Sequence, residues 1–481
     1  MKRVLLKALS IALIICLIAT LYGCTGSGNE TSSNTSSNVL STTTNVSQSA
    51  SSAISITAPN ITVSYERVSS SAQSWGGTSS ATAPLYTPSS PDPNYAFDGS
   101  ISFAVLNRYL DRAMTFSALY WQKDLDEHIR MFKNLGIKYI PRVSAEWHPG
   151  SFEQERGDEL KAMVDKIHYA DPDIIVEACI FECVTKQVEM IKIPTHVQEA
   201  FGEKVQKNRF FDLEKMTFDK GDSFVNHWGD DQHVPDITKL ETQMFFYTRA
   251  CEYIDLGYES IHLGQANMIG KNDKNNECWT KVIKMIRAYA KKNARRHYVL
   301  INAHTHPKEA FVGTDGVMLV DFNAYPTRMH ATGEQTAHEP SENNPQKCAI
   351  GNHEWPDIYK SGIDGKSPSG WYSDKYPYLV EFDNGSIDVG IINTPVRAWG
   401  YDEISWYAYQ PYSYRKEFME YLYKEIKSYK ENGHIALPGS RGLAASSVTT
   451  GGIYFANSKS HLQKGWGDEG FFKELLQKYA K

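Results

Sequence analysis

The sequence lacks an excess of positive charge. Its 481 residues carry 50 lysines and arginines against 56 aspartates and glutamates, a formal net charge of −6 at pH 7. A surface that binds nucleic acid or anionic lipid needs a basic excess. We therefore expect no nucleic-acid partner. Hydrophobic residues make up 41% of the chain, which is enough for one large domain or for two to three ordinary ones.

Paired cysteines and a dinucleotide motif are also lacking. Beyond Cys16 and Cys24 near the N-terminus, five cysteines remain without CxxC spacing, which favours neither a disulfide framework nor a zinc site. We interpret them as small apolar core residues. No apolar run of strand length is followed by GxGxxG, so nothing favours a dinucleotide-binding fold, and we expect no cofactor and no metal.

The N-terminus has the pattern of an export signal. A basic start is followed by a short apolar run, so we interpret residues 1–23 as a signal peptide rather than a spanning helix. The run ends in Leu21-Tyr22-Gly23-Cys24, which resembles the lipobox of bacterial lipoproteins. This resemblance implies a lipid on Cys24 and a protein anchored to the membrane of a bacterial cell, at the cell surface or in the envelope, outside the cytoplasm.

A low-complexity segment follows the signal. Residues 25–62 are rich in Ser, Thr and Asn and contain no aromatic residue. Such a segment cannot bury enough apolar surface to offset its conformational entropy. We therefore expect residues 24–95 to be a flexible tether and residues 96–481 to be the folded catalytic domain.

Beyond Ala96, apolar runs of strand length alternate with amphipathic segments of helix length. The expected strands are residues 101–106, 137–143, 174–181, 260–263, 298–303, 317–320, 378–382 and 434–437. The expected helices are residues 124–135, 155–169, 237–256, 277–293, 415–432 and 469–479. This alternation predicts an α/β fold with a parallel sheet, best described as a (β/α)8 TIM barrel with long loop insertions, although no helix is evident after the fifth run.

Polar side chains gather where the expected strands end, and in such barrels the active site lies at the carboxyl ends of the strands. The stretch YLVEFDNG, residues 378–385, places Glu381 among core residues and ends in further polar groups. Buried carboxylates are rare unless they are paired or needed. The candidates for substrate binding are Arg142, Glu146, Trp147, Trp228, His262, Gln265, Asn302, His304, Asn323, Trp371, Asp383, Asn384 and Arg441.

Several carboxylates in one pocket suit the cleavage of glycosidic bonds. One carboxyl group must be protonated so that it can donate to the leaving oxygen, and a second must be ionised so that it can attack carbon or activate water. Placing acids together separates their pKa values. Tryptophans in the loops suit flat sugar faces. The expected substrate is therefore an extracellular poly- or oligosaccharide.

The barrel pattern and Glu381 at the end of the seventh strand resemble the clan of barrel glycoside hydrolases in which that glutamate is the nucleophile. The likeness covers residues 96–481. That clan carries Asn-Glu at the end of the fourth strand, with the glutamate as acid/base, whereas this chain has Gln265. Because an amide cannot donate a proton as a carboxylic acid does, the acid must come from elsewhere, or the resemblance stops at the fold.

For the missing acid we rank Glu182 first, Asp321 second and Glu146 third. Glu182 ends the third apolar run, where a strand opens into a pocket. Asp321 ends the sixth run, although an aspartate there often caps the next turn. Glu177 lies in mid-strand, and we interpret it as structural.

Two alternatives remain open. His304 and His306 in INAHTH resemble the metal motif of amidohydrolase barrels, but that motif ends the first strand and not the fifth. A non-catalytic lipoprotein that binds glycans at the cell surface would use the same anchor, tether and aromatic side chains. Gln265 at the usual acid position favours this second alternative.

Overall fold

The computed structural model describes residues 92–480, except for 118, 120–123, 307–308, 334–337, 352–358, 360–362, 389–396, 430–431, 446–449 and 458–464. The expected signal peptide, Cys24 and nearly all of the expected tether lie outside the described residues. In the part of the chain that is described, no helix combines the length and the apolar character that a membrane span needs.

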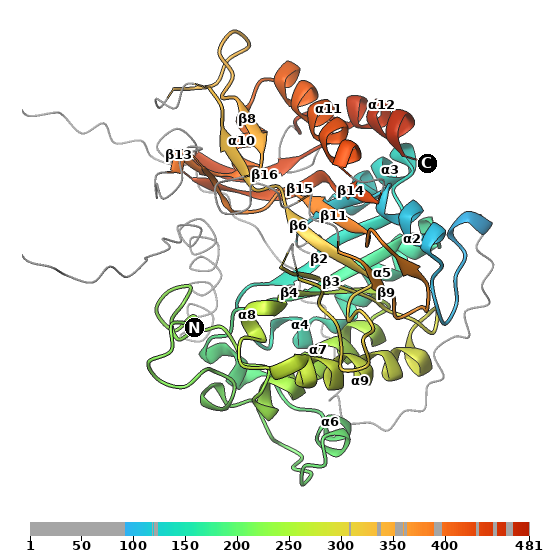
Figure 1. Cartoon of the computed structure of the whole chain (residues 1–481), viewed down its shortest axis with the longest axis vertical. Coiled ribbons are helices and arrows are strands. Elements are labelled where there is room, and N and C mark those ends of the chain that lie inside the picture. Colours follow the sequence, from blue (N-terminus) through green and yellow to red (C-terminus); the bar gives the residue numbers. More distant parts are fainter. Residues whose placement is uncertain are drawn as a thin grey trace, which may run out of the picture. The chain divides into compact units, whose positions relative to one another are not determined.

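A curled parallel sheet forms the centre of the fold (Figure 1). Its seven strands pair in the order β14-β11-β6-β5-β4-β3-β2, and all of these pairs are parallel. The strands are β2 (Tyr139–Glu146), β3 (Ile175–Ile180), β4 (Ser260–Gln265), β5 (Leu300–His304), β6 (Phe322–Pro326), β11 (Tyr378–Glu381) and β14 (Gly433–Ile435). Mixed α/β structure with such a sheet is a TIM-barrel-like fold.

Two further strands connect the edges of this sheet. Strand β15 (Leu437–Ala445) follows β14 after the single residue Ala436 and pairs in parallel with β1 (Met114–Phe116). A parallel bridge between Ala113 and Tyr139 then links the start of β1 to β2. The chain therefore runs from β14 directly into β15, and parallel pairing links β15 to β1 and the start of β1 to β2.

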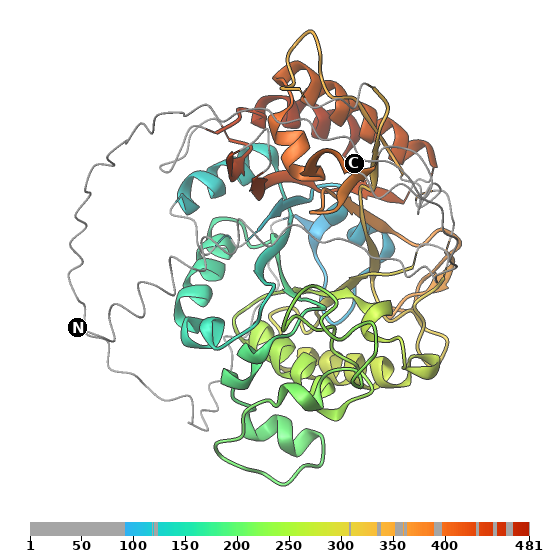
Figure 2. The ribbon, with the colours of Figure 1, turned by 90° about the vertical axis from the view of Figure 1, so that its left-hand side faces the viewer.

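Helices cover the outside of the sheet. Figures 1 and 2 show α7 and α9 on one side of the strands and α11 and α12 on the opposite side. The helices are α2 (Phe103–Leu110), α3 (Leu125–Leu135), α4 (Phe152–Glu155), α5 (Gly157–Ala170), α6 (Thr195–Ala200), α7 (Leu240–Asp255), α8 (Ala266–Ile269), α9 (Glu277–Asn293), α10 (Glu403–Tyr409), α11 (Tyr412–Tyr429) and α12 (Glu469–Tyr479). All six predicted helices are present, with ends shifted by a few residues.

The remaining elements are short. The strands outside the central sheet are β7 (Met329–Ala331), β8 (Cys348–Ile350), β9 (Gly365–Lys366), β10 (Tyr372–Ser373), β12 (Ser386–Asp388), β13 (Arg397–Asp402) and β16 (Thr450–Phe455). Most of them lie between β6 and α10, where the described residues contain no helix. This region is an insertion of β structure in place of the helices of a regular repeat.

Two of the predicted strands are wrong. Residues 103–106 begin helix α2, because Ser102 caps its first turn and Val105, Leu106, Tyr109 and Leu110 give a buried face of helical period. The first parallel strand is instead β1. Residues 317–320 contain only isolated β-bridges at Val317 and Met318 followed by a bend, and the sixth strand begins later, at Phe322.

Helix α2 closes the amino-terminal end of the sheet. Its apolar side chains share one buried cluster with the first residues of several strands, among them Tyr139, Ile175, Leu300 and Phe322. Tyr95, which precedes α2, is buried against Tyr109. The folded unit therefore includes residues before Ala96. The polar side chains lie at the other end of the sheet, where the strands have their carboxyl ends.

We predict that Leu106→Ala lowers the free energy of unfolding by about 2 to 5 kcal/mol, the usual cost of a cavity at a fully buried leucine. The matched control is Leu240→Ala, because the Leu240 side chain is 38% exposed. It should change stability by less than about 1 kcal/mol. Urea unfolding of both variants checks this; equal losses would contradict the role of α2 as a core element.

Candidate active site

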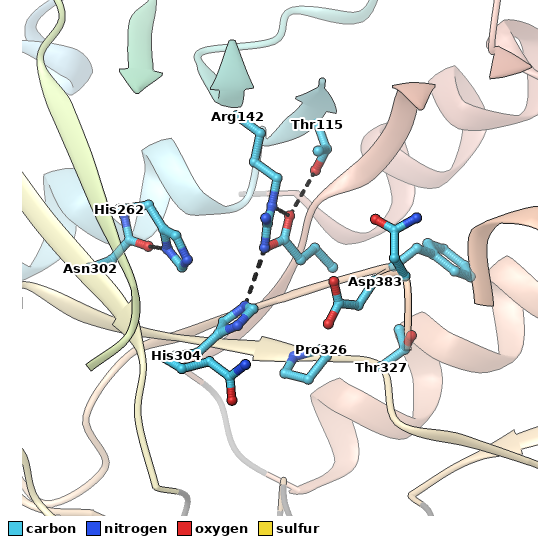
Figure 3. Close-up of polar contacts among 12 residues, drawn as sticks. Thr115, Arg142, His262, Asn302, His304, Pro326, Thr327 and Asp383 are labelled. Atoms are coloured by element: carbon cyan, nitrogen blue, oxygen red, sulfur yellow. Dashed lines mark hydrogen bonds and ion pairs between the residues drawn. The ribbon is translucent and has the colours of Figure 1, made fainter. Parts of the chain in front are cut away.

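Glu381, the last residue of β11, is the centre of a buried ion-pair cluster. Figure 3 shows its partners Thr115, Arg142 and His304. The Nε of Arg142 lies 2.8 Å from both carboxylate oxygens, and Nη2 of the same guanidinium donates to Oε1. Thr115 Oγ1 lies 3.5 Å from Oε2, His304 Nε2 lies 3.6 Å from Oε1, and Arg441 Nη1 lies 3.8 Å from Oε2. Side chains from β1, β2, β5 and β15 thus meet the end of β11.

The surroundings of Glu381 keep it ionised. Burial alone would raise the pKa of this carboxyl group, but Arg142, His304 and Arg441 together hold the pKa well below its usual range. Burial also acts against ionisation of Asp383, whose pKa is nevertheless lowered by His304 and Arg142. Two negative groups therefore lie beside the guanidinium groups at the carboxyl end of β11.

Arg142 reaches Glu381 because its backbone leaves the regular strand. The pairing of β2 with β3 shifts register between Ile140 and Ser144, and Arg142 has a φ of 63°. A left-handed backbone at a residue other than glycine costs roughly 1 to 2 kcal/mol. Such strain persists only where the surrounding contacts enforce it.

A buried polar layer lies next to this pair, inside the sheet. Glu177 accepts hydrogen bonds from the Arg142 backbone N–H at 3.2 Å, from Ser260 Oγ at 3.1 Å, from Asn302 Nδ2 at 2.5 Å and from the Tyr139 hydroxyl. Burial raises the pKa of Glu177. This side chain, which sequence reasoning left in mid-strand as structural, directly supports Arg142.

His262 extends the layer towards β5. Its Nδ1 lies 2.7 Å from Asn302 Oδ1, an oxygen that can only accept, so Nδ1 carries the proton. Burial holds the pKa of His262 well below its usual value, and the ring is neutral. The buried Nε2 has no hydrogen-bond partner among the described residues and is left as an acceptor.

Glu182 lies just beyond β3 and is held by the end of β4. Gln265 donates to it twice, from its backbone N–H at 3.0 Å and from its side-chain amide at 2.8 Å. The backbone of β4 lies close to the Glu182 side chain, because a Cβ added to Gly264 would overlap Glu182 Oε2. Gly264 also has a φ of 61°. The residue at the expected acid position therefore binds the carboxylate of a neighbouring strand.

Aromatic side chains lie next to Glu182 in the chain and in the fold. The Trp228 indole N–H donates to the Glu182 backbone oxygen at 3.2 Å. The Trp147 ring centre lies 5.3 Å from that of Trp228 and 5.6 Å from that of Phe181. Both tryptophans are half-buried, so part of each indole remains open to solvent or to a ligand.

The loop after β11 is fixed by contacts that sequence reasoning missed. Arg441 donates to the Phe382 backbone oxygen and to Asn384 Oδ1, each at 2.9 Å. Glu403 accepts from the Asp383 backbone N–H at 3.1 Å and from the Thr327 hydroxyl, and burial raises the pKa of Glu403 to about 7. Glu403 follows the helix cap Asp402, so its only sequence signal is that of a helix start.

Four further sequence-predicted residues make their contacts away from both the Glu381 cluster and Glu182. Asp321 precedes β6 at its amino end, where it binds Arg287 at 3.1 Å and Tyr298 at 2.5 Å. Trp371 packs at the same end and donates to the Ile101 backbone oxygen. The predicted strand at 317–320 put Asp321 at the wrong end, because the strand itself begins after that residue.

Glu146 and Asn323 are the other two. Glu146 lines a small cavity with Arg249 and Tyr253 of α7, and burial raises its pKa to about 8. Asn323 accepts from Thr305 Oγ1 at 2.8 Å. Glu146 therefore contributes to the packing of α7 against β2 and β3.

The described residues hold no group of three His, Cys, Asp or Glu side chains that could bind a metal ion. His304, one of the two histidines in the amidohydrolase alternative, lies 3.3 Å from Arg142 Nη2. Its ring joins the Glu381 cluster.

No protein-family model and no curated protein matches the chain. The solved structures that it resembles include glycoside hydrolases. The isomalto-dextranase of Arthrobacter globiformis T6 is 10% identical over 78% of this chain and 57% of that one, with a TM-score of 0.40. The glycoside hydrolase domain of PelA from Pseudomonas aeruginosa is 9% identical over 68% and 93%, with a TM-score of 0.32.

The GH27 β-L-arabinopyranosidase of Geobacillus stearothermophilus is 12% identical over 46% of this chain, with a TM-score of 0.25. This chain spans 54% of that enzyme's length. At such scores these likenesses carry no argument about the reaction. The side chains themselves determine what chemistry is possible.

We predict that Gly264→Ala destabilises the protein by about 1 to 3 kcal/mol, because the new Cβ clashes with Glu182 and the residue needs a left-handed backbone. Gly470→Ala is the control, since a Cβ there meets nothing within 4 Å. Urea unfolding measures both. A Gly264→Ala variant as stable as the control would contradict the close packing of β4 on Glu182.

Proposed function

We propose that this protein is a glycoside hydrolase that cleaves an extracellular poly- or oligosaccharide with two carboxyl groups. The observation that carries the proposal is the ionised Glu381 at the carboxyl end of β11, met by side chains from four other strands. An ionised carboxylate in that place can attack the anomeric carbon or take a proton from water.

Closure of the barrel is part of the same proposal. We infer that β1 and the β14–β15 segment complete a (β/α)8 barrel with long insertions, because their pairings connect the two edges of the sheet. The carboxyl ends of barrel strands are where such enzymes bind substrate. Glu381, Arg142 and His304 all lie at or next to that end.

Glu182 is the acid in this proposal. It lies just beyond β3, and its backbone and side chain are fixed by Trp228 and Gln265. A group held in one orientation can deliver its proton to the leaving oxygen without reorganisation. Trp147 and Trp228 would stack on the sugar rings of the substrate.

The location of the protein is also a proposal. We infer that Cys24 carries a lipid and that residues 24–95 tether the enzyme to the membrane on the outer side, at the cell surface or in the envelope of a bacterium. Its support is the lipobox-like end of the N-terminal apolar run. An anchored hydrolase of this kind would meet soluble or cell-wall glycans.

A second candidate is a non-catalytic protein that binds glycans. The observation in its favour is that Glu381 and Glu182 both have protein partners already, Arg142 for one and Gln265 for the other. A buried ion pair is often only structural. Wild-type protein that binds glycans and releases no reducing ends would favour this candidate.

We predict that Glu381→Gln lowers kcat by at least about 100-fold, since the amide is neither a nucleophile nor a base. Release of reducing ends from a polysaccharide panel measures the rate, and circular dichroism gives the folded fraction of the same sample. Stability should fall by about 3 to 5 kcal/mol, because Arg142 loses its buried partner.

Asp321→Asn is the matched control. It also breaks a buried carboxylate–arginine pair, but at the amino end of β6. It should lower stability by a similar amount and leave the rate per folded molecule within about twofold of wild type. If Glu381→Gln kept the wild-type rate per folded molecule, Glu381 would be a structural residue.

Cys24→Ala should move the protein from the membrane fraction to the soluble fraction when cells are lysed and centrifuged, because the thioether-linked lipid would be lost. Replacement of Cys183, which is buried in the fold, should leave the distribution unchanged. Membrane retention of the Cys24→Ala variant would contradict the lipid anchor.

A further inference from the structure

The buried carboxyl group of Glu177 has no part in the proposed reaction. Glu177 lies on β3 and is 2% exposed. It accepts hydrogen bonds from three other strands, with Tyr139 and Arg142 on β2, Ser260 on β4 and Asn302 on β5. Glu177 therefore ties these strands together next to Glu381.

One of these donors is a backbone group in an unusual conformation. The left-handed φ of Arg142, at the register shift of β2, directs its N–H to Glu177 Oε1. A buried backbone N–H is almost always paired. Glu177 is the acceptor that the structure gives to this group, so it compensates for the strained backbone.

The same residue holds the reactive carboxylate through its side chain. Arg142 Nε lies 2.8 Å from both oxygens of Glu381. One arginine thus connects two carboxyl groups, Glu177 through its backbone and Glu381 through its guanidinium. The contact with both oxygens depends on where the backbone of Arg142 lies, because the planar guanidinium tolerates little misalignment.

We propose that Glu177 is a positioning residue, which fixes the left-handed backbone of Arg142 so that the guanidinium meets both oxygens of Glu381. The inference rests on the proposed role of Glu381. It goes beyond that role, because Glu177 acts through another residue and contacts no reacting atom.

The test compares three variants by crystal structure and by the pH profile of kcat/KM. Glu177→Gln keeps one acceptor oxygen but adds donors where Tyr139, Ser260 and Asn302 already donate. Glu177→Asp keeps the charge and shortens the reach by one methylene, and it serves if the first variant fails to fold. Glu259→Gln is the control for stability loss, since Glu259 is a buried glutamate paired with Arg295 and Arg296.

In both Glu177 variants we expect φ at residue 142 to leave the left-handed region and at least one Arg142–Glu381 contact to exceed about 3.5 Å. Losing that contact raises the pKa of Glu381. The acid limb of the profile should therefore move to higher pH by at least about one unit. Glu259→Gln should change neither the geometry nor the limb.

The two proposals fail in different ways. If wild-type protein hydrolyses no glycan, the proposed function fails, and the crystal structures alone decide whether Glu177 positions Arg142. If wild type is active and a folded Glu177 variant keeps the geometry of Arg142 and the acid limb, the positioning role is overturned.

Discussion

The buried pair between Arg142 and Glu381 constrains the rest of the structure. Removing two charges from water costs several kcal/mol for each ion, and their attraction offsets this only when the remaining donors and acceptors are satisfied. Here Thr115 and Arg441 approach the second oxygen of Glu381, and Glu177 accepts the backbone N–H of Arg142. Strands far apart in the chain must therefore keep their register for the pair to form.

The two ends of the sheet differ in the side chains that they carry: the amino end is mainly apolar, and the carboxyl end holds buried charges. At the amino end, α2 covers the first residues of the strands with apolar and aromatic side chains, and Asp321 is satisfied by Arg287 and Tyr298. At the carboxyl end, Glu381 and Asp383 are ionised against the tendency of burial. Such buried charges persist only where the surrounding structure is stable enough to hold them, and the apolar packing at the amino end stabilises that structure.

The alternation of apolar runs predicted six of the parallel strands and all six helices. The polar residues read at the ends of the runs include Arg142, His304, Glu381 and Arg441, which the structure brings together. Strand ends meet in a parallel barrel, so that rule needs no distances. The rule failed where an apolar run did not coincide with a strand of the structure. The run at 317–320 precedes β6, and Asp321 consequently lies at the amino end. Strand β1 is only three residues long, too short to stand out. Glu403 acts through partners distant in sequence, which no local pattern indicates.

The bulge in β2 explains why Arg142 and Glu146, which the sequence places together, lie in different surroundings in the structure. Simple alternation from Tyr139 places Arg142 and Glu146 on the same face of the strand. The register shift after Ile140 turns Arg142 into the interior, where it meets Glu381, while Glu146 remains beside Arg249 of α7. Burial, together with the nearby carboxyl group of Glu153, raises the pKa of Glu146 to about 8, so at neutral pH this carboxyl group is mostly protonated. One local departure from strand geometry therefore gives two residues of the same expected site opposite electrostatic roles: a charged partner inside the sheet and a neutral packing group outside it.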